Sequence, residues 1–148
     1  MNDAAYDAKI WLMRNDENEQ ERLKTIRTVL LIQSKLNNSV ASYEQRGRRD
    51  RISAQASHED LLADYSEACK KLEAITSKVL HEDIVTIRTI DKLQSCLHQT
   101  ILLDVHLNRQ SFNDISKSGK YDLKKRQLYN HYKTALQELA AVLAKEPR

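Results

Sequence analysis

Apolar residues recur at every third or fourth position along most of the chain, which is the period of an amphipathic α-helix. Over residues 1–45 this pattern predicts one long helix, which the polar run at 15–21 could interrupt. Its second part carries a continuous apolar stripe of Leu23, Ile26, Val29, Ile32, Leu36, Val40 and Tyr43. The pattern stops at Gly47.

Residues 46–58 lack this period and are rich in arginine, so we predict a basic loop there. Ser57 followed by Asp60 resembles a capping box and predicts the start of the next helix. That helix carries apolar residues in alternating steps of four and three, namely Leu61, Tyr65, Ala68, Leu72, Ile75 and Val79. Such a heptad pattern fits either an antiparallel hairpin with the preceding helix or a parallel coiled-coil dimer.

Helical periodicity continues through residues 84–105, a stretch long enough that we expect a break near 81–83 or around Ile90. A helix carrying Leu93, Leu97, Ile101 and Val105 is predicted to end at about 106–109. Ser111 with Asp114 forms a second capping-box pattern, which opens a short helix at 111–117 with Phe112 and Ile115 facing inward.

Gly119 is expected in a turn with a left-handed backbone, and Asp122 is expected to cap the last helix. The predicted buried stripe of this helix is Leu128, Tyr132, Ala135 or Leu136, Leu139 and Leu143. A support helix, a short helix, a tight turn and a longer helix are the parts of a helix-turn-helix.

Composition agrees with an all-α fold. The 148 residues include two glycines and one proline, too few for the turns of a sheet protein. We predict long N-terminal helices, as a hairpin or coiled-coil arm, over 1–88, with the basic loop at 46–58. A helix-turn-helix region is predicted over 89–148.

Charge is segregated, although the net charge is only +3. Residues 1–45 carry a net charge of −1, residues 46–51 carry +3, residues 52–108 carry −4 and residues 109–148 carry +5. A basic C-terminal quarter on an acidic body favours a nucleic-acid partner.

The last helix presents basic and amide side chains on its predicted outer face, where arginine can read guanine and amides can read adenine. The predicted base-contacting residues are Lys125, Arg126, Gln127 and Asn130. The predicted phosphate-contacting residues are Arg109, Ser111, Lys117, Lys120, Lys124, Tyr129 and Lys133. The alternative is a solvated basic face on an ordinary bundle helix.

A second basic patch is predicted at Arg46, Arg48, Arg49 and Arg51, with a solvated interhelical loop as the equally weighted alternative.

The run from Ile101 to Leu139 resembles region four of bacterial sigma factors and, more closely, the RinA/ArpU-type regulators of phages of Gram-positive bacteria. The resemblance lies in Ser111-Phe-Asn-Asp-Ile115-Ser116, in Arg126-Gln127-Leu128-Tyr129 and in Ala135-Leu136. The stretch between Ile115 and Ala135 is somewhat longer than in that family, with the surplus around 123–125. The resemblance implies DNA binding, control of late phage or mobile-element genes, and contact with RNA polymerase.

No catalytic arrangement is visible, so we expect no enzyme, no cofactor and no small-molecule substrate. The histidines at 58, 81, 98, 106 and 131 have no metal-ligand spacing, and no metal is expected. Cys69 and Cys96 are expected to be reduced, partly buried thiols. Trp11 is expected in the core or in a dimer contact.

We expect a cytoplasmic homodimer in a bacterial host, with duplex DNA as its partner and no membrane association. The alternative is a non-enzymatic helical protein that binds and modulates RNA polymerase, a repressor or a host factor.

Overall fold

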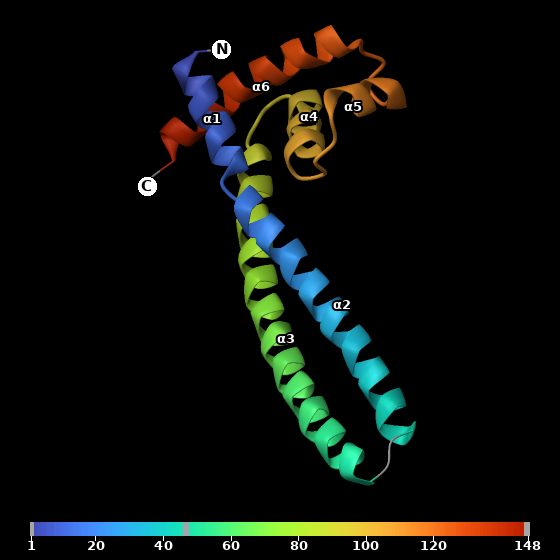
Figure 1. Ribbon diagram of the computed structural model, residues 1–148. Helices are drawn as coiled ribbons and strands as arrows, with labels where there is room; N and C mark the ends of the chain where they lie inside the picture. Colours follow the sequence, from blue (N-terminus) through green and yellow to red (C-terminus); the bar gives the residue numbers. More distant parts are fainter. Residues whose placement is uncertain (1, 46–47, 147–148) are drawn as a thin grey trace. The chain divides into compact units, whose positions relative to one another are not determined.

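The computed structural model describes residues 2–45 and 48–146, with side chains at 39–56 left out of the description. The described residues form helices and no strands, which confirms the all-α prediction (Figure 1). In order they are α1 (Asp3–Met13), α2 (Asp16–Gln45), α3 (Arg48–Ile90), α4 (Cys96–His106), α5 (Phe112–Ser118) and α6 (Lys125–Lys145). Within the described part, no helix is long and apolar enough to cross a membrane.

The chain divides into two compact units, residues 16–80 and residues 1–15 together with 81–148. This differs from the predicted division at residue 88, because α1 packs on α6 rather than on α2. Ala5, Ala8 and Leu12 supply the buried side of α1. The small alanine side chains allow α1 and α6 to approach closely, and this packing places the N-terminal helix in the C-terminal unit.

The break in the first predicted helix is confirmed at Arg14 and Asn15. The Arg14 guanidinium lies 3.9 Å from the centre of the Trp11 ring, and its Nε donates to a Glu82 carboxylate oxygen at 2.9 Å. Asn15 is buried, and its Nδ2 donates to Asp83 at 2.9 Å. These side-chain bonds fasten the end of α1 to the last turns of α3.

In the other unit, α2 and α3 run antiparallel, which is the hairpin alternative of the prediction (Figure 1). The Glu21 carboxylate and the Lys71 ammonium pair at 3.2 Å between the two helices. The apolar stripes predicted for the two helices meet along a seam between α2 and α3. Residues of these stripes such as Val29 and Leu72 are half-buried in the seam rather than fully buried.

The predicted loop at 46–58 is wrong from Arg48 onward, because α3 begins there and Ser57 lies inside the helix. Arginine, alanine and glutamine are good helix formers, so this stretch stays helical without an apolar stripe. Gly47, which disfavours a helix, lies in the pair 46–47 outside the described residues.

The C-terminal core is formed by α1, α4, α5 and α6 together with Ile90 and Leu93. The predicted buried stripe of α6 is confirmed, since Leu128, Tyr132, Ala135, Leu136 and Leu139 are all buried. Leu143 is half-buried at its end.

Candidate nucleic-acid interface

Local sequence signals set the path of the chain from α4 to α6. The Ser111 Oγ accepts the backbone N–H of Asp114 at 3.1 Å, so the predicted cap of α5 is confirmed. Gly119 ends α5 with φ +70°, the left-handed conformation that glycine adopts without a steric penalty. Ile115 is buried and Phe112 packs against the core, as predicted.

The predicted cap of α6 is wrong. Asp122 has φ +52°, and the N-cap residue is Lys124. Here the amide oxygen of Gln127 accepts the backbone N–H of Lys124 at 3.1 Å. Because α6 begins at Lys125, three residues beyond Asp122, the Gln127 side chain supplies the cap instead.

A buried carboxylate holds the turn between α5 and α6 against α4. Asp104 is 3% exposed and accepts bonds from Lys120 Nζ at 3.0 Å, from Asn108 Nδ2 at 3.1 Å and from the Tyr121 hydroxyl. Burial alone would raise the pKa of Asp104, but these bonds and the Lys120 charge hold that pKa below its ordinary value. Burial and the carboxylate also raise the pKa of Tyr121.

Asp104 was missed in the sequence, although an acidic residue inside the apolar run 101–105 is unusual enough to be a signal. Its partners are up to 17 residues away in the chain. We therefore regard Asp104 as a positioning residue for the turn.

An aromatic cluster sets the angle between α5 and α6. Phe112 meets the rings of Tyr129 and Tyr132 edge-on, with centroid distances of 5.6 and 5.0 Å. The Tyr132 hydroxyl lies 2.8 Å from His106 Nε2 at the end of α4. Burial, with smaller contributions from Lys9 and Arg109, lowers the pKa of His106 to about 4, so the ring is neutral at neutral pH and shares one hydrogen bond with the Tyr132 hydroxyl.

A second histidine joins α4 to α6. His98 is buried, its Nδ1 lies 3.0 Å from both oxygens of Glu138, and its Nε2 lies 3.3 Å from His131 Nδ1. The Glu138 carboxylate accepts a hydrogen bond from His98 Nδ1, and a second hydrogen bond joins His98 Nε2 to His131 Nδ1. In the described part of the chain, no group of three or more metal-ligating side chains lies together.

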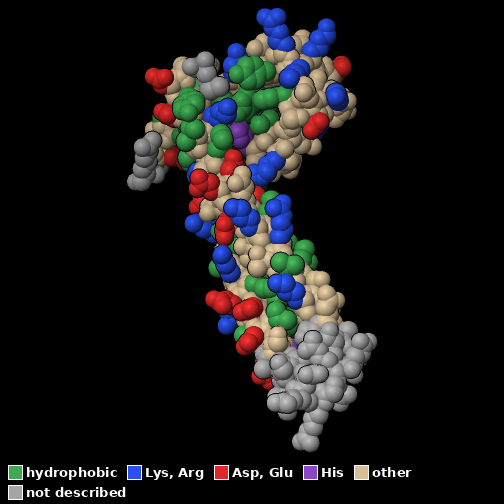
Figure 2. Space-filling view, in the orientation of Figure 1, with side chains coloured by type: hydrophobic (Ala, Val, Ile, Leu, Met, Phe, Trp, Pro, Cys, Tyr) green, Lys and Arg blue, Asp and Glu red, His purple; other side chains and the backbone are tan. Residues whose placement is uncertain are grey.

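The residues predicted to read bases are exposed on α6, and Figure 2 shows Lys and Arg side chains gathered where α5 meets the start of α6. Helical spacing puts Arg126, Asn130 and Lys133 in line on the outer side. Lys125 lies instead on the flank with Tyr129, four positions further on. Gln127 is exposed, with its oxygen engaged in the cap.

The predicted phosphate contacts are spread over the turn and both helices. Ser111, Lys117 and Lys124 are exposed, and Lys133 is half-buried with its ammonium 5.1 Å from the centre of the Tyr129 ring. Lys120 is paired with Asp104. Arg109 is exposed in the connection between α4 and α5, with φ +54°.

The N-terminal end of α1 limits how much of α6 is accessible. Asn2, which caps α1, lines a polar hollow of about 370 Å³. Its other lining residues are Asn130, Lys133, Thr134 and Gln137 of α6. The part of the outer side clear of α1 is therefore the first turn, which carries Arg126 and Gln127.

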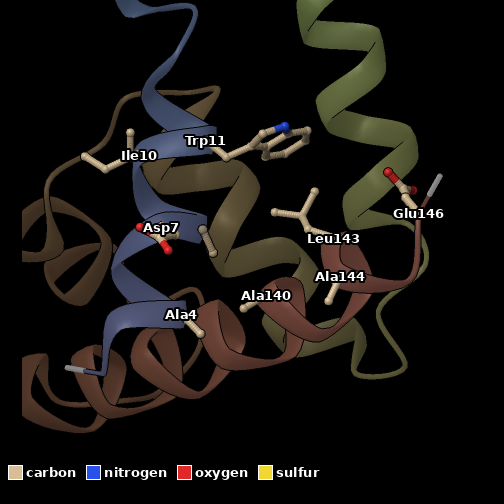
Figure 3. Close-up of a pocket in the computed structure, with 9 residues that line it drawn as sticks. Ala4, Asp7, Ile10, Trp11, Ala140, Leu143, Ala144 and Glu146 are labelled. Carbon is tan, nitrogen blue, oxygen red and sulfur yellow. The ribbon is translucent and has the colours of Figure 1, made fainter. Parts of the chain in front are cut away.

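A second hollow, of about 630 Å³, follows the junction of α1 and the end of α6. Figure 3 shows Trp11 of α1 and Leu143 of α6 pointing toward one another, with alanines from both helices along the floor. Its Glu146 is paired with Lys92. Trp11 is half-buried and packs against the core, which is one of the two places predicted for it.

The predicted second patch at Arg46, Arg48, Arg49 and Arg51 lies outside the residues whose side chains are described. Of the two free cysteines, Cys69 is half-buried and Cys96 is exposed, so only Cys69 matches the expected partial burial.

Comparisons of the chain with models of protein families, with curated proteins and with solved structures found no significant match. The functional assignment therefore depends on the site itself.

Proposed function

We propose that this protein is a sequence-specific DNA-binding transcriptional regulator, with α5 and α6 as the helix-turn-helix. The observation that carries the proposal is the exposure of Arg126, Gln127 and Asn130 over the first turns of α6, on the side opposite its buried stripe. In a helix-turn-helix, the N-terminal residues of the second helix contact base edges.

The mechanism is occupancy of the major groove rather than chemistry. Lys117, Lys124 and Lys125 would neutralise phosphates and release counterions. Arg126 would donate to a guanine, and the Gln127 amide NH₂ remains free of the cap and would donate to an acceptor on a base edge. The helix cap occupies one lone pair of the Gln127 amide oxygen. To bind adenine with both its oxygen and its NH₂ group, Gln127 would have to accept the adenine amino group with the second lone pair.

The resemblance to RinA/ArpU-type regulators extends the proposal to late phage or mobile-element genes, to RNA polymerase as a further partner and to a homodimer on paired half-sites. A dimer would present two recognition helices to a symmetric operator.

Replacing Arg126 with alanine is expected to weaken binding to the cognate site about 30-fold and to relax the base preference at one position. The measurement is a band shift with DNA fragments flanking the gene, at two salt concentrations. Lys145→Ala is the matched control, because it also removes one exposed positive charge but at the far end of α6. It should leave the affinity for DNA unchanged.

Lys133→Ala provides a graded comparison, because α1 stands beside Lys133 and we expect a smaller effect there than at Arg126. Equal effects at residues 126, 133 and 145 would show that only net charge matters. Retention of affinity and of base preference in both Arg126→Ala and Gln127→Ala would reject reading by this helix.

A second candidate function, binding to another protein without catalysis, is favoured by one observation. Tyr6, Ile10 and Met13 follow helical spacing along α1 and are 54%, 48% and 41% exposed, outside the buried alanine side. This candidate predicts that the protein does not retain DNA. It also predicts that a partner protein co-purifies with the natural chain and is lost from the Ile10→Glu variant. Arg126→Ala would then leave that partner bound.

A further inference from the structure

The hairpin unit has little core of its own. Among its described residues only Thr25 and Val79 are buried, and the seam between α2 and α3 remains half-exposed to water. Helices in proteins owe most of their stability to packing of an apolar side. Two helices alone cannot enclose such a side, whereas four helices packed as a bundle can.

One side of the hairpin is polar. Glu21 and Lys71 pair there, and helical spacing places Lys35 of α2 and Asp64 of α3 on the same side of the seam. Charged side chains and water satisfy this side, so it does not require a cover.

The opposite side is apolar over its middle, between Glu59 and Glu73 of α3. On α2, Leu23, Ile26 and Leu30 lie on the flank of the seam away from Glu21, at the spacing of neighbours on one helical side. On α3, Leu62 and Cys69 lie one heptad apart on the flank away from Lys71. Glu21 and Lys71 pair on one side of the two antiparallel helices, so the flank of α2 away from Glu21 and the flank of α3 away from Lys71 lie together on the other side. These five residues therefore share one surface. We call this surface the leucine face.

The antiparallel register brings the leucine face together as matched pairs. Because Glu21 is level with Lys71, Leu23 comes level with Cys69, and Leu30 comes level with Leu62 one heptad further along. Leu23, Leu30 and Leu62 are 42%, 58% and 47% exposed. Hydrophobic side chains are visible on the surface of the hairpin in Figure 2.

We propose that the leucine face is the dimer interface, covered by the same face of a second copy so that two hairpins form a four-helix bundle. Residues 16–38 give about 35 Å of helix, and two neighbouring helices are about 20 Å wide. A second copy packed along this whole length, with the leucine face at the centre of the contact, would therefore bury about 700 Å² of each copy. That area is close to the roughly 800 Å² per partner of stable interfaces. A two-fold axis through the leucine face would place the Leu23–Cys69 and Leu30–Leu62 pairs of one copy against the same pairs of the other copy.

The sharpest test compares two neighbouring leucines of α2. Leu30 and Leu31 are 58% and 57% exposed, and only Leu30 lies on the leucine face. Light scattering after gel filtration should give twice the 17.2 kDa chain mass for the natural protein and for Leu31→Glu. Leu30→Glu should raise the dimer dissociation constant about 100-fold, because symmetry places the change in the interface twice.

A monomer at every concentration up to about 100 µM would overturn the proposal, including the case in which a different protein covers the face. Equal loss of the dimer in Leu30→Glu and Leu31→Glu would also overturn it. Far-UV circular dichroism checks that both variants remain helical.

The thiol of Cys69 gives a second readout that does not depend on mass. Burial in the dimer should slow the reaction of Cys69 with a maleimide, and dilution or Leu30→Glu should restore that rate, while Cys96 reacts at one rate throughout. A Cys69 rate that neither dilution nor Leu30→Glu changes would contradict the interface. The dimer and DNA binding by α6 are tested by different measurements, so either can fail while the other holds. Only the homodimer on paired half-sites in the proposed function depends on this interface.

Discussion

Replacing Asp104 with alanine is expected to lower the free energy of unfolding of the C-terminal unit by about 2 kcal/mol, because the change removes a buried acceptor and leaves the half-buried Tyr121 hydroxyl without it. The Tyr121 hydroxyl and the Asn108 amide both donate to this carboxylate. Asp104→Asn keeps an acceptor but loses the charge, so its effect should be smaller. Thermal or urea unfolding followed by circular dichroism measures the difference.

A double-mutant cycle separates the contact from general damage to the core. Tyr121→Phe should destabilise the natural protein but cost almost nothing once Asp104 is alanine. Because the pKa of Asp104 is lowered on folding, the contribution of its charge is present above the ordinary aspartate pKa of about 3.9 and disappears as the pH falls through the lowered value. Additive effects of the two replacements would show that the hydrogen bond contributes nothing specific.

Acidification is expected to destabilise the protein through His106 before most carboxylates titrate. The unfolded chain binds a proton at this residue near pH 6.5, whereas in the folded state the pKa is lowered to about 4. The unfolded state therefore gains protons first, and stability falls with pH between these two values. Between about pH 8 and about pH 4.5 the loss from this residue is about 2 to 3 kcal/mol.

His106→Gln provides the test, because its amide group can still form a hydrogen bond with the Tyr132 hydroxyl while carrying no titratable proton. Its unfolding free energy should decline less steeply over the same pH range. His81→Gln, at an exposed position of α3, should decline as steeply as the natural protein. Parallel curves for all three proteins would exclude His106 as the source of the acid sensitivity.

Elements with local signals could be predicted from the sequence. Ser111 and Gly119 bound α5 because a cap oxygen and a left-handed turn are encoded within a few residues. The buried stripe from Leu128 to Leu139 follows from helical spacing alone. For the same reason, the exposure of Arg126 and Asn130 could be predicted without coordinates.

The failures share a different cause. A stretch without an apolar stripe can still be helical, so residues 48–58 were predicted as a loop and form helix. The association of α1 with α6 depends on small alanine side chains, which give no strong pattern. The links of Asp104 to Tyr121 and of His98 to Glu138 join residues far apart in the chain, and no local spacing encodes them.

The docking of α1 on α6 also has a practical consequence for handling the protein. Asn2 lies beside Asn130 and Lys133, so an affinity tag or reporter fused ahead of it would emerge next to the proposed recognition helix. Such a fusion should obstruct an approaching duplex, whereas a fluorophore attached at the same place would report directly on DNA binding through a change in its emission.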